Sequence, residues 1–416
     1  MNEIQEEDDT MISVSFNQDN SCFSLGTQRG FKIYQTYPFR GPYEKIMNGG
    51  IGAVEMLYKS NFLALLGGGI SPKFNNNKVV IWDDYENKII SELKFITPII
   101  NIRLKKDLIF VICQRRIYLF NLNTYDIVEA IDTGDNKKGL IALNSDPDFT
   151  VIGFPSSNKK CGIKNFKTKS NQLFQAQDDN ISYMTMNKEG TFLASTNEKG
   201  TIIRIHSCID GSLLKEFKRG MDKVDYIYIC FDNESKFMAV SSNKGTIHIF
   251  SMGSTKKRFN EIEKMKKDKE SLNKKQNKED ENFEIIGQKE KKESNEVQKI
   301  EENKEDKKEE EKEDEEKKEE KLKEKKIDNE NKNIINENKI NELPQNTKTL
   351  FGSEKSFAQF RIKTQIKNIC TFIDNNILIV VTYDNKYYKA EINKTRGGNC
   401  SLLEEIYLNK QIIHKK

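Results

Sequence analysis

The sequence has few of the residues from which catalytic and metal sites are usually built. It contains three histidines, His206, His248 and His414, and none has a nucleophile or a set of metal ligands at a recognisable spacing. The seven cysteines are scattered and never form a CxxC pair, so they indicate neither a zinc site nor a disulfide framework. We therefore expect no cofactor and no metal, and we predict a binding protein that is not an enzyme.

Long apolar runs are also missing, and we expect no signal peptide. No run approaches the roughly 18 apolar residues of a membrane-spanning helix, and the N-terminal stretch MNEIQEEDDT is acidic, unlike a signal peptide. Scattered cysteines fit a reducing compartment. Together these absences predict a cytoplasmic protein whose contact with membranes is peripheral.

Charge is abundant, but it is concentrated in one segment. Residues 251–350 hold 27 Lys and Arg and 29 Asp and Glu, whereas the rest of the chain holds 41 and 35. That remaining basic excess is too small to indicate a nucleic-acid partner. Residues 252–352 form a low-complexity Lys/Glu-rich stretch; such composition can form a solvated helix but buries no apolar surface, so it favours a disordered loop.

Outside this stretch, short β-rich hairpins recur along the chain. FLASTNEKGTIIRIH (192–206) and FMAVSSNKGTIHIF (237–250) both consist of a strand, a polar turn ending in Lys-Gly-Thr, and a second strand. Hairpins follow one another at intervals of 37 to 49 residues, which is typical of four-stranded propeller blades. One interval is about 141 residues long, and removing the charged stretch restores the period.

We therefore predict an all-β fold, a seven-bladed β-propeller of the WD-repeat type. The blades are expected to begin near residues 11, 51, 97, 137, 179, 224 and 366, with the charged loop inserted within blade 6. A closed ring of sheets protects its own edges, so residues 1–416 are expected to form a single propeller domain.

Two adjacent cations, Lys218 and Arg219, end a predicted strand in the sequence LLKEFKRG. Successive strand side chains point to opposite faces, so neighbours do not serve one pocket. The pair is either a solvated strand end or contributes to two different pockets. His248 alternates with Ile247 and Ile249 and, taken alone, suggests a structural histidine.

Five stretches of the sequence together resemble the PROPPIN family, the WIPI/Svp1 group. They are ISVSFNQDNSCFSLGTQRGFKIYQTYPF, VEMLYKSNFLALLGGG, EFKRG, MAVSSNKGTIHIF and SEKSFAQFRI, in the family's order and with compatible spacing. The resemblance implies a phosphoinositide-binding propeller of autophagy and membrane trafficking. It implies a monomeric adaptor that binds phosphatidylinositol 3-phosphate or 3,5-bisphosphate on pre-autophagosomal, endosomal or vacuolar membranes and recruits autophagy lipid-transfer or conjugation machinery.

The resemblance also assigns site residues. In the family, a Phe/Leu-Arg-Arg-Gly motif directs its two arginines to separate headgroup pockets. By position, the first pocket is lined by Thr196, Asn197, Thr201, Arg204 and Lys218, the second by Arg219, Ser241, Ser242, Thr246 and His248, and Gly220 is the motif glycine. Lys218 replaces an arginine and lacks its planar fork, and Asn197 stands where serine is usual, so the first pocket is expected to be the weaker one. We expect both cations on an exposed rim.

The family's blade 6 loop dips into the bilayer, but here its central part is acidic. Residues 301–320 carry 13 acidic and 6 basic side chains, which an anionic leaflet repels. We therefore expect membrane contact from the flanks, at Phe283, Ile334, Ile335 and Ile340. The alternative function is a WD-repeat protein-protein interaction scaffold without lipid binding, with the central channel face as its binding surface.

Overall fold

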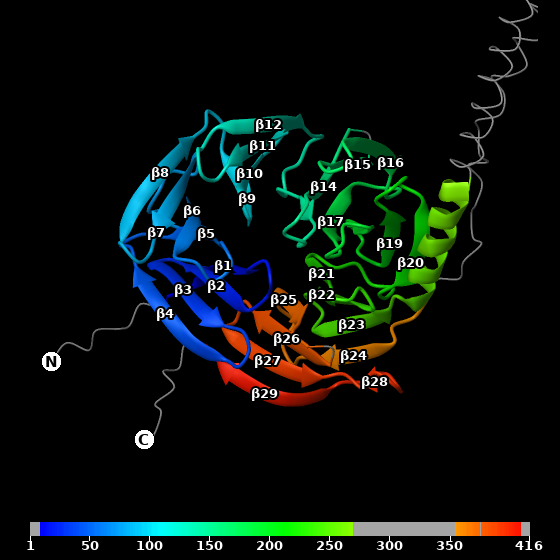
Figure 1. Ribbon diagram of the computed structural model, residues 1–416. Coiled ribbons are helices and arrows are strands. Elements are labelled where there is room, and N and C mark those ends of the chain that lie inside the picture. Colours follow the sequence, from blue (N-terminus) through cyan, green and yellow to red (C-terminus); the bar gives the residue numbers. More distant parts are fainter. Residues whose placement is uncertain (1–8, 158, 269–353, 375, 409–416) are drawn as a thin grey trace, which may run out of the picture. The chain divides into compact units, whose positions relative to one another are not determined.

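Seven antiparallel sheets, arranged as a ring around a central channel, make up the body of the protein (Figure 1). The structure is a computed structural model and describes residues 9–157, 159–268, 354–374 and 376–408. One compact unit consists of Met1–Phe259 and Ser353–Lys416, and a second of Asn260–Gly352. The description below concerns the first unit, and it confirms the predicted seven-bladed propeller.

Within each blade, the strands follow one another along the chain from the channel outward (Figure 1). Blade 1 contains β1 (Met11–Phe16), β2 (Cys22–Thr27), β3 (Gly30–Gln35) and β4 (Arg40–Ile46); blade 2 contains β5 (Ile51–Met56), β6 (Phe62–Gly67), β7 (Lys78–Asp83) and β8 (Lys88–Lys94); blade 3 contains β9 (Ile99–Lys105), β10 (Leu108–Cys113), β11 (Arg116–Asn121) and β12 (Ile127–Asp132). Blade 4 contains β13 (Ala142–Leu143), β14 (Val151–Pro155), β15 (Lys160–Asn165) and β16 (Ser170–Gln175).

The remaining blades carry the predicted site residues and the insertion. Blade 5 contains β17 (Ile181–Met186), β18 (Phe192–Asn197), β19 (Ile202–Ser207) and β20 (Leu213–Lys218); blade 6 contains β21 (Ile227–Phe231), β22 (Phe237–Ser242), β23 (Thr246–Ser251) and β24 (Ala358–Arg361), with β28 (Gly398–Asn399) added in parallel to β24; blade 7 contains β25 (Asn368–Phe372), β26 (Ile377–Thr382), β27 (Lys386–Glu391) and β29 (Ser401–Tyr407). Each blade begins within five residues of its predicted start.

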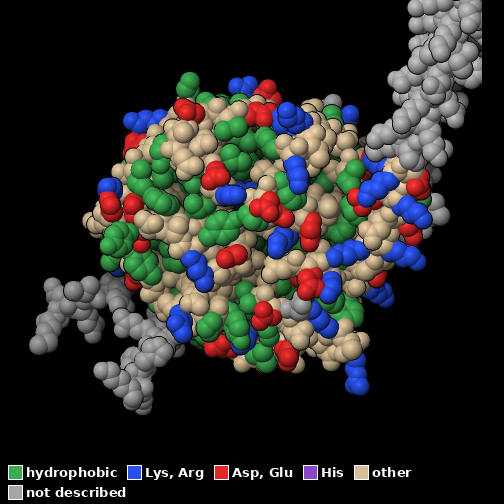
Figure 2. All heavy atoms as spheres, viewed as in Figure 1, with side chains coloured by type: hydrophobic (Ala, Val, Ile, Leu, Met, Phe, Trp, Pro, Cys, Tyr) green, Lys and Arg blue, Asp and Glu red, His purple; other side chains and the backbone are tan. Residues whose placement is uncertain are grey.

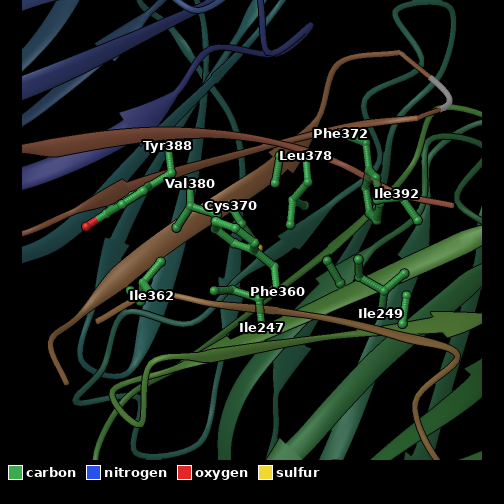
Figure 3. Packing of buried hydrophobic residues seen from close by; sticks show 13 residues of the cluster. Ile247, Ile249, Phe360, Ile362, Cys370, Phe372, Leu378, Val380, Tyr388 and Ile392 are labelled. Atoms are coloured by element: carbon green, nitrogen blue, oxygen red, sulfur yellow. The ribbon is translucent and has the colours of Figure 1, made fainter. Parts of the chain in front are cut away.

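Alternating side chains on β23 separate a core face from a polar face. Ile247 and Ile249 are fully buried and pack with Cys370 and Val380 of blade 7 (Figure 3). Because strand side chains alternate, Thr246 and His248 project to the opposite face, toward blade 5. The apolar contact between blades 6 and 7 therefore fixes the direction of the predicted site residues.

The ring closes between blades 7 and 1 through side chains, because each of these blades is a complete sheet of its own. Phe23 stacks on Tyr34 with ring centroids 5.0 Å apart. The Tyr34 hydroxyl donates to the Leu408 carbonyl at 3.0 Å, and the Tyr387 hydroxyl donates to the Thr36 carbonyl at 2.9 Å. Closure thus depends on buried aromatic packing and two hydrogen bonds that cross the junction.

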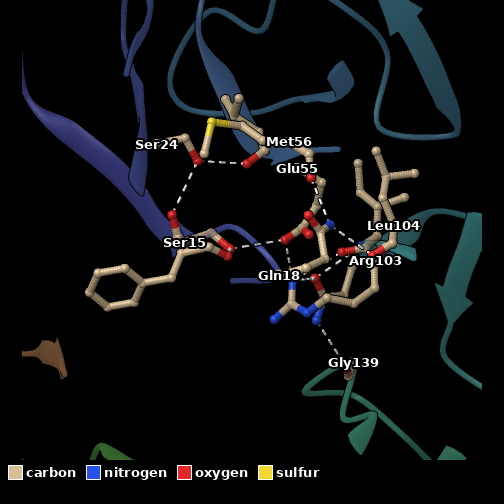
Figure 4. A network of polar contacts seen from close by, with 12 residues as sticks. Ser15, Gln18, Ser24, Glu55, Met56, Arg103, Leu104 and Gly139 are labelled. Carbon is tan, nitrogen blue, oxygen red and sulfur yellow. Dashed lines mark hydrogen bonds and ion pairs between the residues drawn. The ribbon is translucent and has the colours of Figure 1, made fainter. Parts of the chain in front are cut away.

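A polar network ties the innermost strands of blades 1 to 3 together around the channel (Figure 4). Glu55 accepts hydrogen bonds from Ser15 Oγ at 3.0 Å and from Arg103 Nη1 at 2.6 Å. Burial raises the pKa of Glu55, although Arg103 opposes the shift. Gln18 Nε2 donates to backbone carbonyls of blades 2 and 3. These bonds satisfy buried polar groups and indicate a structural role for the network.

The charged insertion leaves the propeller after β23 and returns before β24, within blade 6 as predicted. Residues 253–268 form a helix, so the start of the insertion is helical as one of the two interpretations has it, but Thr255 and Phe259 are buried instead of solvated. Phe259 packs edge-on against Phe192 of blade 5 at 5.2 Å. On the return, Glu354 forms a parallel bridge with Phe217, and the Lys218 amide donates to the Glu354 carbonyl at 3.0 Å. Both ends of the insertion are therefore attached to blade 5.

Candidate anion-binding site

Two hairpin turns position the predicted site residues of blades 5 and 6. Their Lys-Gly-Thr sequences place Gly200 and Gly245 at φ of +65° and +75°, where glycine is the favoured residue. A Cβ on Gly245 would lie 2.9 Å from the Thr364 carbonyl oxygen. Asn197 Oδ1 accepts from the amides of Lys199 and Gly200 at 3.1 and 3.3 Å. Asn197 therefore shapes the blade 5 turn, and its oxygen is already engaged.

The strand geometry of β20 separates Lys218 from Arg219. Lys218 is exposed and lies opposite Ile202, on the face of blade 5 that also carries Arg204. Phe217, on the other face, packs on Phe250 of blade 6 with centroids 5.0 Å apart. Arg219 is the first residue after β20, lies on the side of blade 6, and is only 6% exposed. The expectation of an exposed rim is thus correct for Lys218 and wrong for Arg219, which lies beneath the blade 5 turn.

Backbone groups hold Arg219 in place. Its amide donates to the Thr201 carbonyl at 2.9 Å, its Nε donates to the Gly200 carbonyl at 2.6 Å, and its Nη2 donates to the Asp222 carbonyl. Burial lowers the pKa of Arg219, which the charge of Asp222 partly offsets. Carbonyl oxygens orient a guanidinium without neutralising it. At Gly220 a Cβ would meet no atom within 4 Å, so packing does not explain this glycine.

Cationic and hydroxyl side chains converge on the side of blade 6 that faces blade 5. Thr246 on β23 is paired with Arg361 on β24, and His248 Nδ1 lies 3.4 Å from Ser356 Oγ. Burial, and then the positive charges of Arg219 and Arg361, lower the pKa of His248 to about 4. A neutral imidazole therefore lies near two guanidinium groups at pH 7.

The two serines of β22 lie on opposite faces of the strand. Ser241 is fully buried, and its Oγ donates to the Asn368 carbonyl of blade 7 at 3.3 Å. Ser242 is also buried, and alternation places it on the same face as Thr246. The structure thus brings Arg219, Ser242, Thr246 and His248 to one side of blade 6, whereas Ser241 faces blade 7.

The residues predicted for the first pocket are more dispersed. Arg204 forms ion pairs with Glu216 at 2.6 Å and with Asp178 at 2.7 Å. Burial opposes its charge, but these two carboxylates outweigh burial and hold its pKa above the usual value. Thr196 is buried, and its hydroxyl donates to the carbonyl of Ile202 on the neighbouring strand β19 at 2.8 Å. Lys218 remains as a cation that forms no ion pair with a carboxylate of the described residues.

Sequence reasoning missed Arg361 and Ser356. Both lie in the stretch SEKSFAQFRI, but their pairing with β23 spans the whole insertion and cannot be read from spacing. The four predicted membrane-contact residues, Phe283, Ile334, Ile335 and Ile340, lie outside the described residues, and their role stays a prediction.

A functional site could also be marked by a second cavity, a cluster of metal ligands, a membrane-spanning helix or a charged surface patch. At the channel mouth, a cavity of about 440 Å³ is lined by Arg103, Tyr183 and Tyr226, among others. Within the described part of the chain, no group of three or more His, Cys, Asp and Glu is placed to hold a metal. No described helix is long and apolar enough to cross a membrane. On the face in Figure 2, basic and acidic side chains are interspersed.

The sequence profile of the PROPPIN family matches residues 10–265. The chain belongs to the PROPPIN family. Among curated PROPPIN relatives, Autophagy-related protein 18e of Arabidopsis thaliana is 33% identical over 248 residues, which cover 58% of this chain and 65% of the relative. SVP1-like protein 2 of Saccharomyces cerevisiae is 33% identical over 282 residues, which cover 59% of this chain and 63% of the relative. The matched region therefore spans slightly less than two thirds of these relatives.

Solved structures support the propeller fold of this PROPPIN. The crystal structure of Hsv2 from Kluyvelomyces marxianus aligns with a TM-score of 0.63 at 18% identity, covering 96% of this chain and 99% of that one. KlAtg21, solved in complex with the coiled-coil of AgAtg16, aligns with a TM-score of 0.63 at 17% identity, covering 96% of this chain and 100% of that one. At this identity, the likeness establishes the fold alone.

Proposed function

We propose that this PROPPIN is a peripheral membrane adaptor that binds phosphatidylinositol 3-phosphate or 3,5-bisphosphate. The observation that carries the proposal is the approach of Arg219 and Arg361 to the neutral His248 beside the Thr246 hydroxyl. Guanidinium groups and hydroxyls are the donors that a phosphomonoester requires. The open space at Gly220 leaves room for a headgroup next to Arg219.

Each side chain of this second pocket has a distinct part. Arg219 is fixed by carbonyl oxygens, so little side-chain entropy is lost when it meets a phosphate. Arg361 is exposed and supplies a second charge from β24. His248 has its pKa lowered by burial and by these cations, so a bound phosphate dianion would raise that pKa again. A bound phosphate would therefore favour the protonated form of His248 more than the empty pocket does.

The first pocket lies on the opposite face of blade 5 and depends on Lys218. Because the nearby Arg204 is already paired with two carboxylates, this pocket offers less uncompensated charge. Two weak pockets on either side of blade 5, in one rigid propeller, can bind the same membrane, and their combined avidity exceeds either affinity. The protein therefore binds phosphoinositide-rich membranes through two pockets at once.

The partners proposed are autophagy proteins, namely lipid-transfer or conjugation machinery. The relatives bear autophagy-related names, and KlAtg21 was solved with a coiled-coil. The outer strands of blades 2 and 3 expose Ile89, Ile90, Ile127 and Val128. Exposed apolar side chains of this kind mark protein contacts, and these strands belong to blades other than those of the lipid pockets. We place the protein in the cytoplasm and on pre-autophagosomal, endosomal or vacuolar membranes.

Flotation of the full chain with liposomes tests this proposal. Liposomes that contain phosphatidylinositol 3-phosphate or 3,5-bisphosphate should carry the protein upward, whereas liposomes of unphosphorylated phosphatidylinositol should not. Equal recovery with and without the phosphorylated lipids would instead favour the protein-scaffold alternative. The panel also determines which phosphoinositide is preferred.

The two motif cations are expected to contribute unequally to binding. Arg219→Ala should weaken liposome binding more than Lys218→Ala, because it removes a fixed guanidinium. Lys218→Arg should strengthen binding, since it adds a planar donor fork to the first pocket. Lys59→Arg on exposed blade 2 surface is the matched control. Equal losses for the two alanine variants, with no gain for arginine, would contradict this ranking.

A further inference from the structure

The backbone hydrogen bond that positions Arg219 recurs after the outer strands of other blades, among them blade 3. Arg219 follows the outer strand of blade 5, and its amide donates to the Thr201 carbonyl in that blade's turn at 2.9 Å. Thr133 follows the outer strand of blade 3, and its amide donates to the Arg115 carbonyl in the corresponding turn, also at 2.9 Å. The linker after blade 3 is therefore the structural counterpart of the linker that carries Arg219.

The next hairpin along the ring is also equivalent. Lys159 in the β14–β15 turn has φ of +64°, and Gly245 in the β22–β23 turn has φ of +75°. This correspondence makes Lys160 the counterpart of Thr246. The left-handed conformation costs about 1 to 2 kcal/mol for a residue other than glycine. Lys159 is one of ten described non-glycine residues with a positive φ, so its conformation shows the equivalence of the hairpins and does not by itself mark a site.

Linker and hairpin together enclose a cavity of about 570 Å³. The linker contributes Lys137 and Lys138 to its wall, and the hairpin contributes Lys159 and Lys160 together with serine hydroxyls. The linker reaches this hairpin directly, because the amide of its Gly134 donates to a carbonyl at the end of β14 at 3.0 Å. The cavity therefore lies between a linker and a hairpin equivalent to those beside Arg219, but its lysines stand at other positions than the arginines. Asn180, Ile181 and Glu198 complete its lining.

Asp135 and Glu198 also line the cavity, so four lysines there face two carboxylates and a positive excess is left. Lys137 lies 3.3 Å from Asp135, and Lys159 lies 4.0 Å from Asp179. Lys138 and Lys160 form no ion pair with a carboxylate of the described residues. An excess of ammonium groups around a concave space attracts anions, and a lysine binds phosphate as a point charge.

We propose that this cavity between blades 3 and 4 is a third anion site, which takes a ligand with several phosphomonoester groups. Its volume lies within the range of small-molecule sites and is larger than one phosphate requires. The ligand is the phosphorylated inositol ring, either as a soluble inositol polyphosphate or as a lipid headgroup. The proposal uses no residue of the two pockets beside blade 5.

Calorimetric titration of the full chain with inositol hexakisphosphate, at fixed ionic strength, tests the site. The Lys159→Ala/Lys160→Ala variant should bind inositol hexakisphosphate at least ten-fold more weakly than the wild type does. The Lys137→Ala/Lys138→Ala variant should show a loss of the same size. Lys59→Ala/Lys73→Ala removes two exposed charges from blade 2 and is the matched control. Because inositol hexakisphosphate can also enter the other pockets, the titration is repeated in a Lys218→Ala/Arg219→Ala background, where this site's binding should persist.

Liposome flotation then distinguishes the source of the phosphate. A loss of flotation in Lys159→Ala/Lys160→Ala identifies a lipid headgroup, and unchanged flotation with weakened titration identifies a soluble polyphosphate. Absence of binding in the Lys218→Ala/Arg219→Ala background would overturn this site while leaving the blade 5 pockets in place. The site would also be overturned if the Lys137/Lys138 and Lys159/Lys160 variants bound inositol hexakisphosphate as tightly as the blade 2 control variant does.

Discussion

Replacing Lys218 and Arg219 together by alanine is expected to abolish phosphoinositide-dependent flotation. The two side chains project to opposite faces of blade 5, so the double change removes one phosphate donor from each pocket. A charge-assisted hydrogen bond contributes about 1.5 to 3 kcal/mol, so two such losses lower affinity by at least about a hundred-fold. Binding to liposomes of known phosphoinositide content measures the effect.

Because Arg219 is buried and bonded to backbone carbonyls, its loss can also loosen the linker. A second variant, Lys218→Ala/Arg361→Ala, changes two exposed side chains and should also reduce binding strongly. Lys59→Ala/Lys73→Ala should bind as the wild type does. If both pocket variants keep the wild-type melting temperature and still float normally, the assignment of the pockets is wrong.

Removing the Tyr387 side chain is expected to destabilise the propeller by about 3 to 5 kcal/mol, the range for large aromatic-to-alanine changes in a core. Tyr387 is fully buried at the junction between blades 7 and 1 and packs near Phe39 with centroids 4.6 Å apart. Among the described residues no strand is shared across this junction, so side-chain packing and two side-chain hydrogen bonds close the ring. Urea unfolding of Tyr387→Ala measures the loss.

A milder variant separates packing from hydrogen bonding at the same position. Tyr387→Phe keeps the ring and leaves the Thr36 carbonyl without its donor, so it should cost about 1 kcal/mol. Tyr85 is 88% exposed, and Tyr85→Ala is the control that should leave stability unchanged. A Tyr387→Ala protein as stable as this control would show that the ring closes by other means.

The architecture could be predicted because it is repeated locally. Each hairpin has its own turn signal, and the Lys-Gly-Thr turns require glycine at a positive φ, as found at Gly200 and Gly245. The alternation of strand side chains likewise predicts that Lys218 and Arg219 point to opposite faces. These features depend on neighbours in sequence, so one chain is enough to reveal them.

The details of the site depend on contacts between distant segments. Arg361 lies opposite Thr246 only because two strands pair across the insertion. One of the two ion pairs of Arg204 is with Asp178, in the linker between blades 4 and 5. The burial of Arg219 follows from the carbonyl of Gly200 above it. Period and composition contain no information on these pairings, which explains why the pocket residues were assigned by resemblance and not by geometry.

The attachment of Phe259 and Glu354 to blade 5 has a consequence for how this gene segment can change over generations. The entropy of closing a flexible connection rises only with the logarithm of its length, so doubling the length costs about 0.6 kcal/mol. With both attachment points made by residues of the propeller itself, Lys/Glu codons between them can be duplicated or lost at little cost to the ring. Selection on the propeller therefore leaves the length of the insertion nearly neutral.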